Sequence, residues 1–266
     1  MAIDITALYC CLDDFCKVFE DWEAHRLIPS QTTRQRTGKL SRSEMLFIMV
    51  LFHLSPFKHF KVFYHYGIGQ QHRACFRELP HYDRFVGLMP RLFAPLMVLL
   101  HSLSGAQTGI YFADSTKLAV CHNRRIHRHK VFDGLAARGK TSMGWFFGFK
   151  LHFVINHKGQ IMAVKITPGN TADSTVLDAM TRHLAGKLYA DKGYIGQDLF
   201  KTLWQRGLHL ITGIRRNMRN YLMPLADKIM LRKRFVIETV LDTLKSEMGL
   251  EHSRHRSPVN LSLIHI

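Results

Sequence analysis

The order of apolar runs after residue 105 is the feature that most constrains the fold of this chain. A short apolar run at 110–113 is followed by two strand-like segments on either side of a turn at 157–159. Helical and strand-like patterns then alternate: strands at 147–156 and 160–167, a helix at 173–184, a strand at 187–190, a helix at 196–205, a strand at 208–212 and a helix at 228–248. This order predicts a mixed α/β domain in which helices flank a central sheet.

Residues 1–105 show the spacing of apolar side chains that is typical of helices. Ser43 is a candidate cap for a first helix, which the Ser55-Pro56 pair ends. The same pattern predicts further helices at 57–66 and 82–103. Two short helices joined by a tight turn fit either a helix-turn-helix that reads DNA or a plain helical bundle.

A small polar segment at 104–108 separates the helical pattern of the N-terminal part from the mixed helix and strand pattern that follows. Small polar residues between periodic segments mark a linker. The sequence therefore predicts an all-helical domain at 1–105 and an α/β domain at 106–266.

The charge of the chain indicates a polyanionic partner. It carries 37 Lys and Arg against 20 Asp and Glu, a net charge of +17, and its sequence pI is about 10.0. Release of counterions from a phosphate backbone drives such proteins onto nucleic acid. A ribosome-associated or membrane-surface protein is the alternative.

Several features favour a cytoplasmic protein. The five cysteines are odd in number and show no disulfide spacing. We find no signal peptide at the N-terminus. The longest apolar runs, 45–52 and 92–100, are too short to cross a bilayer.

Two aspartates follow apolar, strand-like runs. Asp114 comes directly after 109–113, and Asp191 comes directly after 186–190. Either residue by itself could simply end a strand or shape a turn. Together they suggest carboxylates that share a cleft at one edge of the sheet.

Glu238 lies in the predicted helix 228–248. At 100° per residue it falls with Arg234, Asp242 and Lys245 on the side opposite the apolar residues. This face is either a solvated stripe of ion pairs or a ligand-bearing face over the sheet. In the second case Arg234 and Lys245 would reach for phosphates.

Three carboxylates suit a pair of Mg²⁺ ions, because this hard cation prefers oxygen ligands. Two such ions about 4 Å apart can activate an attacking oxygen and stabilise a leaving one. A zinc site around Cys121 and His129 is a weaker alternative, because the segment lacks a CxxC pair and is rich in Arg.

Clusters of basic residues supply candidate DNA contacts. The segment 121–150 holds seven Lys and Arg but a single acid, Asp133, and it leads into an aromatic run that contains Trp145. It could track a DNA backbone and stack on an unpaired base, or it could be a solvated loop. The candidates are Arg124, Arg125, Trp145, Lys192, Arg215, Arg216, Arg232, Lys233, Arg234 and Lys245.

Five ordered blocks of the sequence closely resemble bacterial DDE transposases and, among them, the insertion sequence 982 family. The blocks are 114–116, 144–152, 168–170, 191–194 and 231–239, and the segment 251–257 is also similar. The resemblance implies a ribonuclease-H-like domain that holds two Mg²⁺ ions, for which Mn²⁺ can substitute. Asp114, Asp191 and Glu238 correspond to its three acidic ligands, and Lys245 to the basic residue that follows the glutamate.

The resemblance also implies an activity and its partners. Metal-dependent cleavage at the ends of an insertion sequence would free a 3′-hydroxyl, which would then attack target DNA. The N-terminal helices would recognise the terminal inverted repeats, and the protein would act as a dimer or a larger assembly on DNA near the bacterial nucleoid.

The chain departs from this pattern after Ser257, where 258–266 does not match the continuation that the family shows. We therefore expect a truncated or altered C-terminus. The alternative function is a catalytically inactive remnant that binds terminal-repeat DNA without cutting it.

Overall fold

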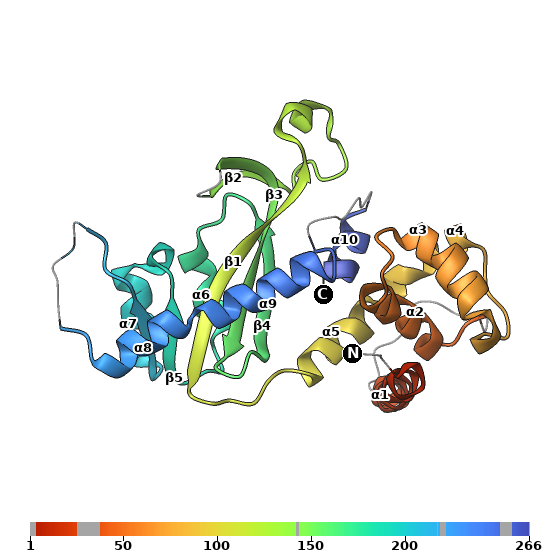
Figure 1. The fold of residues 1–266 in the computed structure, drawn as a ribbon, viewed down its shortest axis with the longest axis horizontal. Coiled ribbons are helices and arrows are strands. Elements are labelled where there is room, and N and C mark those ends of the chain that lie inside the picture. Colours follow the sequence, from red (N-terminus) through yellow and green to blue (C-terminus); the bar gives the residue numbers. More distant parts are fainter. Residues whose placement is uncertain are drawn as a thin grey trace. The chain divides into compact units, whose positions relative to one another are not determined.

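The computed structural model describes residues 4–25, 38–141, 144–216, 218, 222–250 and 257–265. The chain divides into two compact units (Figure 1). The helical unit comprises Met1–Leu103 together with Glu247–Ile266, and the sheet unit comprises Ser104–Ser246. Each unit is described by itself.

The helical unit is built from one long helix, α1, and several shorter ones. They are α1 (Ile5–His25), α2 (Arg42–Leu54), α3 (Phe60–Val62), the π-helical η1 (Phe63–Gln71), the 3₁₀ turns η2 (Arg73–Cys75) and η3 (Met89–Leu92), α4 (Tyr82–Leu88), α5 (Phe93–Ser102) and α10 (Pro258–His265).

Helix α2 begins with a capping box, not with the expected cap at Ser43. The Ser41 hydroxyl accepts from the Glu44 amide, and the Glu44 carboxylate accepts from the Ser41 amide. This arrangement satisfies two amides that the first turn leaves without partners. Ser43 is buried instead. The helix ends before Ser55, as the sequence predicts.

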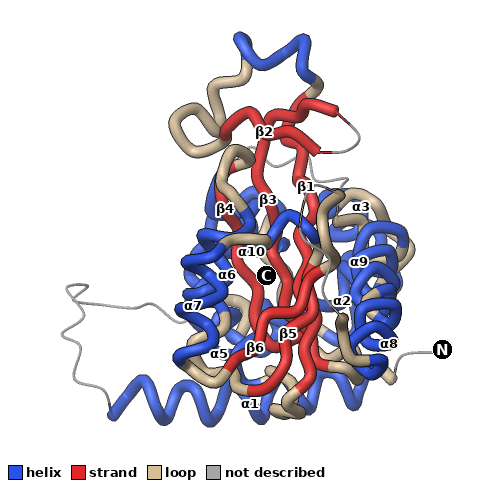
Figure 2. The backbone as a smooth tube through the Cα atoms, turned by 90° about the vertical axis from the view of Figure 1, so that its left-hand side faces the viewer, coloured by secondary structure: helices blue, strands red, loops and turns tan. Residues whose placement is uncertain are grey.

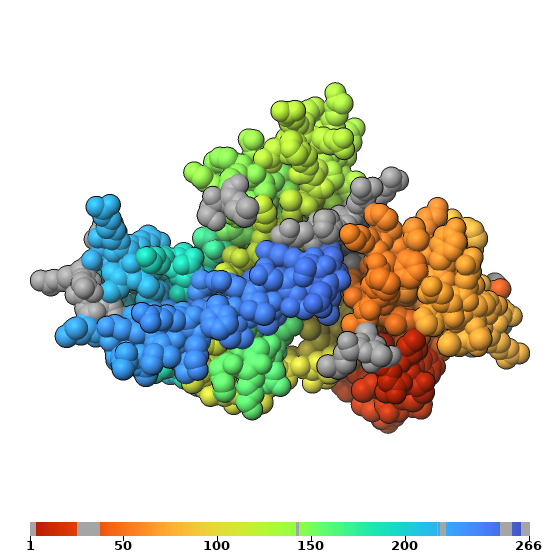
Figure 3. All heavy atoms as spheres, in the orientation of Figure 1, coloured from red at the N-terminus to blue at the C-terminus, as the bar shows by residue number. Residues whose placement is uncertain are grey.

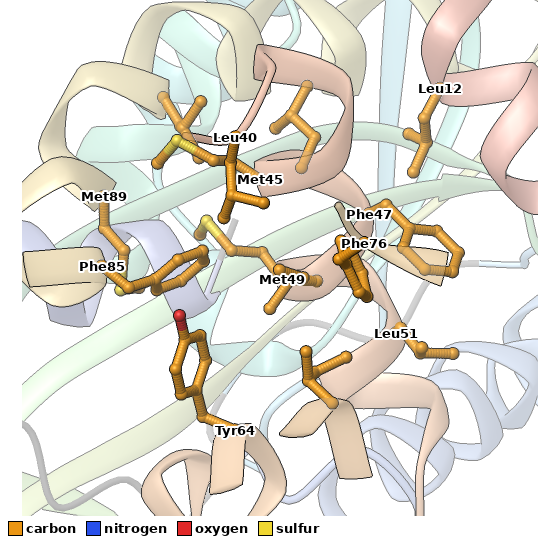
Figure 4. Packing of buried hydrophobic residues seen from close by; sticks show 14 of the residues in the cluster. Leu12, Leu40, Met45, Phe47, Met49, Leu51, Tyr64, Phe76, Phe85 and Met89 are labelled. Carbon is orange, nitrogen blue, oxygen red and sulfur yellow. The ribbon is translucent and has the colours of Figure 1, made fainter. Parts of the chain in front are cut away.

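Aromatic rings pack among leucine, isoleucine and methionine side chains in the core of the helical unit (Figure 4). Phe85 is completely buried, with its ring centroid 5.0 Å from that of Tyr64. The Tyr64 hydroxyl donates to the carbonyl of Pro80 at 2.7 Å, so its polar end is satisfied.

The stretch Tyr82–Ser102 is the one helical segment of the described chain that is long and apolar enough to cross a membrane by length and composition. It consists of α4, η3 and α5, and Phe85, Met89, Leu92 and Leu96 are buried in the core of the helical unit. A core helix meets the same two criteria.

The sheet unit contains a six-stranded mixed sheet. Its strands are β1 (Ile110–Cys121), β2 (Ala137–Thr141), β3 (Gly144–Asn156), β4 (Ile161–Pro168), β5 (Gly186–Ala190) and β6 (Leu208–Thr212). Strands β2 and β4 pair antiparallel with successive parts of β3, which pairs antiparallel with β1. Strands β5 and β6 extend the sheet in parallel from β1.

Helices cover both faces of this sheet (Figure 2). Helices α6 (Asp173–Met180) and α7 (Gln197–Gln205) lie on one face, where Tyr111, Val154 and Leu188 belong to the core beneath them. Helices α8 (Leu225–Lys233) and α9 (Phe235–Ser246) lie on the other face. The predicted mixed α/β architecture is therefore confirmed.

Strand β1 is much longer than the expected run 110–113. Pairing with β3 continues from Tyr111–Asn156 to Cys121–Phe147, so the chain stays extended well past Asp114. The far parts of β1 and β3, with β2 and the 3₁₀ turn η4 (Asn123–Arg128), form a projection that we call the arm, residues 117–141 and 144–148. The arm stands away from the rest of the sheet unit (Figures 1 and 3).

Candidate active site

Asp114 lies inside a strand, not at the end of one. It is the fifth residue of β1 and pairs with Phe153 of β3. The expectation of a strand-end aspartate is wrong because the apolar run stops at Ala113 whereas the hydrogen-bonded ladder does not. Alternation along the strand places Asp114 on the same face as Phe112, which is the face that α8 and α9 cover.

Asp191 lies beside Asp114 because of the parallel register. Ala113 pairs with Ala190, so the residue that follows each of them reaches the same level of the sheet. Asp191 comes directly after β5, as predicted, and caps the short turn η5 (Lys192–Tyr194) by accepting from the Lys192 amide.

Glu238 reaches the same face from α9. The inner side of this helix is fixed by Ile237 and Leu241, which are buried. The single helix expected at 228–248 is two helices, because α8 ends at Lys233 and α9 begins at Phe235. Glu238 therefore lies in the first turn of α9, and 53% of its side chain is exposed.

Arg234, at the junction of α8 and α9, joins two of the three acids. Its Nη1 donates to Asp114 Oδ2 at 3.1 Å, and its Nη2 donates to Glu238 Oε1 at 2.9 Å. The sequence predicted the spacing to Glu238 but gave no sign of the contact with Asp114, which is 120 positions away.

The electrostatic setting of Asp114 disfavours its charged form. Burial raises the pKa of this carboxyl, and the negative charge of Asp191 raises it further, against the Ser115 amide and the Arg234 guanidinium, which lower it. Tyr194 is also affected by these acids. Burial, together with the charges of Asp173, Asp114 and Asp191, raises the pKa of its hydroxyl.

The chemistry of the three acids fits divalent ions, since all are oxygen donors on one face of the sheet. Their arrangement does not. In the part of the chain that the structure describes, no group of three or more His, Cys, Asp or Glu side chains lies close enough together to hold a metal ion. The Arg234 guanidinium is bonded to two of the carboxylates.

Some of the candidate DNA contacts lie around these acids. Arg215 donates to the carbonyl of Lys192 at 2.9 Å, which places it beside Asp191. Arg232 and Lys233 are exposed at the end of α8, and Arg216 is exposed as well. Lys245 follows Glu238 by two turns on the same side of α9.

The other candidates lie in the arm. Arg124 and Arg125 belong to η4 and are exposed. The Trp145 side chain is 57% exposed, with the Arg138 guanidinium carbon 6.0 Å and the Lys140 ammonium 5.6 Å from its ring centroid. Six cations of the arm are exposed and make no ion pair within the described residues: Arg124, Arg125, Arg128, Lys130, Arg138 and Lys140.

A buried carboxylate that the sequence did not single out positions α8. Asp227 Oδ1 accepts from Lys187 Nζ at 2.8 Å and from the Tyr189 hydroxyl at 2.7 Å, both on β5. Burial alone would raise the pKa of Asp227, but the hydrogen bonds from Lys187 and Tyr189 outweigh it and hold this pKa below its ordinary value. Only the contact between helix and strand could have revealed this role.

Asp173 is the first residue of α6 but does not cap it. Ala172 is the cap residue of α6, and Asp173 accepts from Lys150 Nζ at 3.1 Å. His152 is buried beside this pair and shares a 2.8 Å hydrogen bond with the Thr167 hydroxyl. Burial lowers the pKa of His152 to about 4. These side chains tie β3 and β4 to α6.

We expect Asp227→Ala to lower the free energy of unfolding by about 1–3 kcal/mol, because the buried Tyr189 hydroxyl loses its acceptor. Since the folded-state pKa of Asp227 is lowered, its contribution is present above the unfolded pKa of about 4 and disappears as pH falls through the folded-state pKa. Urea unfolding of both proteins from pH 7 to pH 3 measures this. If the difference in the free energy of unfolding between the two proteins grows as the pH falls, Asp227 is not the stabilising carboxylate.

A search of curated proteins gave no significant match. Among solved structures, the piggyBac transposase synaptic complex with hairpin DNA is similar at 10% identity, over 93% of this chain and 70% of that one, with a TM-score of 0.48. The Mos1 mariner paired-end complex with Mn is similar at 9% identity, over 88% and 86% of the two chains, with a TM-score of 0.26.

The family relationship rests on the sequence itself. Residues 104–258 match the family described as the transposase DDE domain, and this is more than half of the 266 residues. The chain belongs to this family.

Proposed function

We propose that this protein is a DNA transposase that cleaves at the ends of its own insertion sequence and joins the freed 3′-hydroxyl to target DNA. One observation carries the proposal. Asp114 on β1, Asp191 after β5 and Glu238 on α9 are brought to one face of the sheet, in a chain of the DDE transposase family.

Asp114, Asp191 and Glu238 would hold two Mg²⁺ ions, or Mn²⁺ in their place, once their side chains lie closer together than they do in this structure. The ions would supply Lewis acidity and lower the pKa of an attacking water. The carboxylates would fix their position, while the basic side chains at Lys192, Arg215 and Lys245 would hold the phosphates on either side.

DNA is the proposed partner at two places. The six exposed cations of the arm offer contacts to a phosphate backbone, and Trp145 among them offers a face for stacking on a base. The helical unit would read the terminal inverted repeats. Two or more copies of the chain would assemble on the paired ends.

We extend the proposal to the type of fold, the transposase family and the roles of the two domains. The strand order β4-β3-β1-β5-β6, with three antiparallel and two parallel strands, supports a ribonuclease-H-like domain. The five sequence blocks support membership of the insertion sequence 982 family, with an end-binding domain at 1–105, a catalytic domain at 106–266 and action at the bacterial nucleoid. Of the similar terminal segment, 251–256 lies outside the described residues.

Cleavage of labelled terminal-repeat DNA by the purified protein with Mg²⁺, beside Asp191→Ala, tests the proposed function. We expect nicks at the element end that fall by at least about 10³-fold in the variant. Binding without cleavage by the unchanged protein would identify the inactive remnant. Equal cleavage by both proteins would remove Asp191 from the site.

A further inference from the structure

Arg234 differs from the other basic residues near the acids in being bonded to the acids themselves. Its guanidinium donates to Asp114 and to Glu238 through two different nitrogens. The side chains of Arg234 and Asp114 are only 21% and 22% exposed, so water screens this pair less than a surface ion pair. Arg232 and Lys233, on the same helix end, are exposed and make no ion pair within the described residues.

The guanidinium and a divalent ion would use the same oxygens. An arginine carries five N–H donors in a planar fork and suits carboxylates on two sides. Each of these oxygen atoms keeps a second lone pair, but the positive guanidinium lies between the two carboxylates, where a divalent ion shared by them would have to bind. Asp114 Oδ1 is also engaged, since it accepts from the Ser115 amide at 2.8 Å. A divalent ion bound between these acids would therefore compete with the like charge of Arg234.

A released Arg234 would lie among groups suited to DNA phosphates. The exposed Arg232 and Lys233 precede it on α8, and a guanidinium binds a phosphate through the same paired donors that now hold the carboxylates. The donors that now bind the acids are thus the ones that would bind a phosphate after release.

We propose that Arg234 is an internal counter-ion which occupies Asp114 and Glu238 in the metal-free protein and exchanges with a divalent cation, whereupon its guanidinium binds a DNA phosphate. The exchange rests on the proposed function only for the role of the three acids as metal ligands. It makes metal binding and DNA binding favour one another.

Binding of Mn²⁺ to the metal-free, DNA-free full chain tests the exchange, with free Mn²⁺ measured by electron paramagnetic resonance. We expect Arg234→Gln to bind Mn²⁺ about 10-fold more tightly than the unchanged protein, because a competing cation is gone. Arg232→Gln is the matched control, with the same change in charge on an exposed neighbour, and we expect less than about a twofold effect. Arg234→Lys, which keeps the charge but cannot bridge both acids, should fall between them.

The outcomes separate this exchange from the proposed function. A residue that merely holds the acids in place would weaken Mn²⁺ binding when replaced, so weaker or unchanged affinity in both Arg234 variants would overturn the exchange. If that result is found and Asp191→Ala abolishes Mn²⁺ binding, the exchange is wrong but the metal site of the proposed function is supported. No saturable Mn²⁺ binding in any protein would overturn both.

A second measurement follows the guanidinium to DNA, with Ca²⁺ as the divalent ion to avoid cleavage. Without Ca²⁺, Arg234→Gln should weaken binding of terminal-repeat DNA no more than Arg232→Gln does. With Ca²⁺, its loss should exceed that of the control by about 10-fold. Equal losses in the two conditions would overturn the transfer of Arg234 to a phosphate.

Discussion

Replacing Asp114 with asparagine is expected to reduce Mg²⁺-dependent cleavage by at least about 10³-fold, or about 4 kcal/mol in the activation barrier, while stabilising the metal-free protein. The two effects share one cause. Burial and the charge of Asp191 raise the pKa of the Asp114 carboxyl, so the folded protein without metal disfavours the carboxylate that catalysis needs. A neutral amide removes that unfavourable charge together with the metal ligand.

The pH dependence of the stabilisation by Asp114→Asn follows from the direction of the pKa shift of Asp114. A raised folded-state pKa means that the unfavourable charge is fully present above that pKa and disappears as pH falls below the unfolded value of about 4. The gain in Tm of Asp114→Asn over the unchanged protein should therefore be largest at neutral pH and shrink on acidification.

Asp242→Asn is the matched control for Asp114→Asn, since Asp242 is an exposed acid of α9 outside the site. It should change neither cleavage nor Tm appreciably. A lower Tm for Asp114→Asn at neutral pH would show that the ion pair with Arg234 outweighs the burial of the carboxylate.

Replacing Gly148 with alanine is expected to lower the free energy of unfolding of the sheet unit by about 3 kcal/mol. Gly148 lies in β3 with a φ of 156°, where it pairs with Ala119 on one side and Ala137 on the other. A Cβ atom at this position would overlap the carbonyl oxygen of Leu118. Because that oxygen belongs to the backbone of the paired strand, relief requires the strands of the arm to separate.

Gly196→Ala serves as the control in the same unit. Its added Cβ would meet only Leu199 at an ordinary 3.8 Å, so the remaining cost is that of alanine at the N-cap of α7, for which we expect less than about 1 kcal/mol. Chemical denaturation of the three proteins measures the difference. A Gly148→Ala protein as stable as the control would mean that the arm tolerates the extra atom by a small shift.

The local sequence was sufficient for elements whose pattern is short-range. The hairpin between β3 and β4, the strands β5 and β6 and helix α7 lie close to the predicted positions, because alternation, helical spacing and turn residues specify them without distant partners. The predicted ends of helices and strands are wrong where strand pairing or helix capping determines them. Strand β1 extends past its apolar run because β3 pairs with it, and α2 is capped by Ser41 because Glu44 completes the box.

The same distinction holds for the candidate site. The sequence blocks singled out Asp114, Asp191 and Glu238, and strand register and helix packing bring them to one face. Trp145 and the arm cations were visible as a basic, aromatic segment. Asp227 gave no local signal, because an acid in the first turn of a helix is common, and only the tertiary structure shows that Lys187 and Tyr189 bind it.

The sequence by itself determined the class of architecture, the basic character and the three acids, because hydrophobic period, charge and motif are properties of neighbouring residues. Only the tertiary structure decided that Asp114 lies in mid-strand, that α8 and α9 break at Arg234, and that this arginine joins Asp114 to Glu238. Those features depend on hydrogen bonds and ion pairs between residues far apart in the chain, whose geometry no local pattern contains.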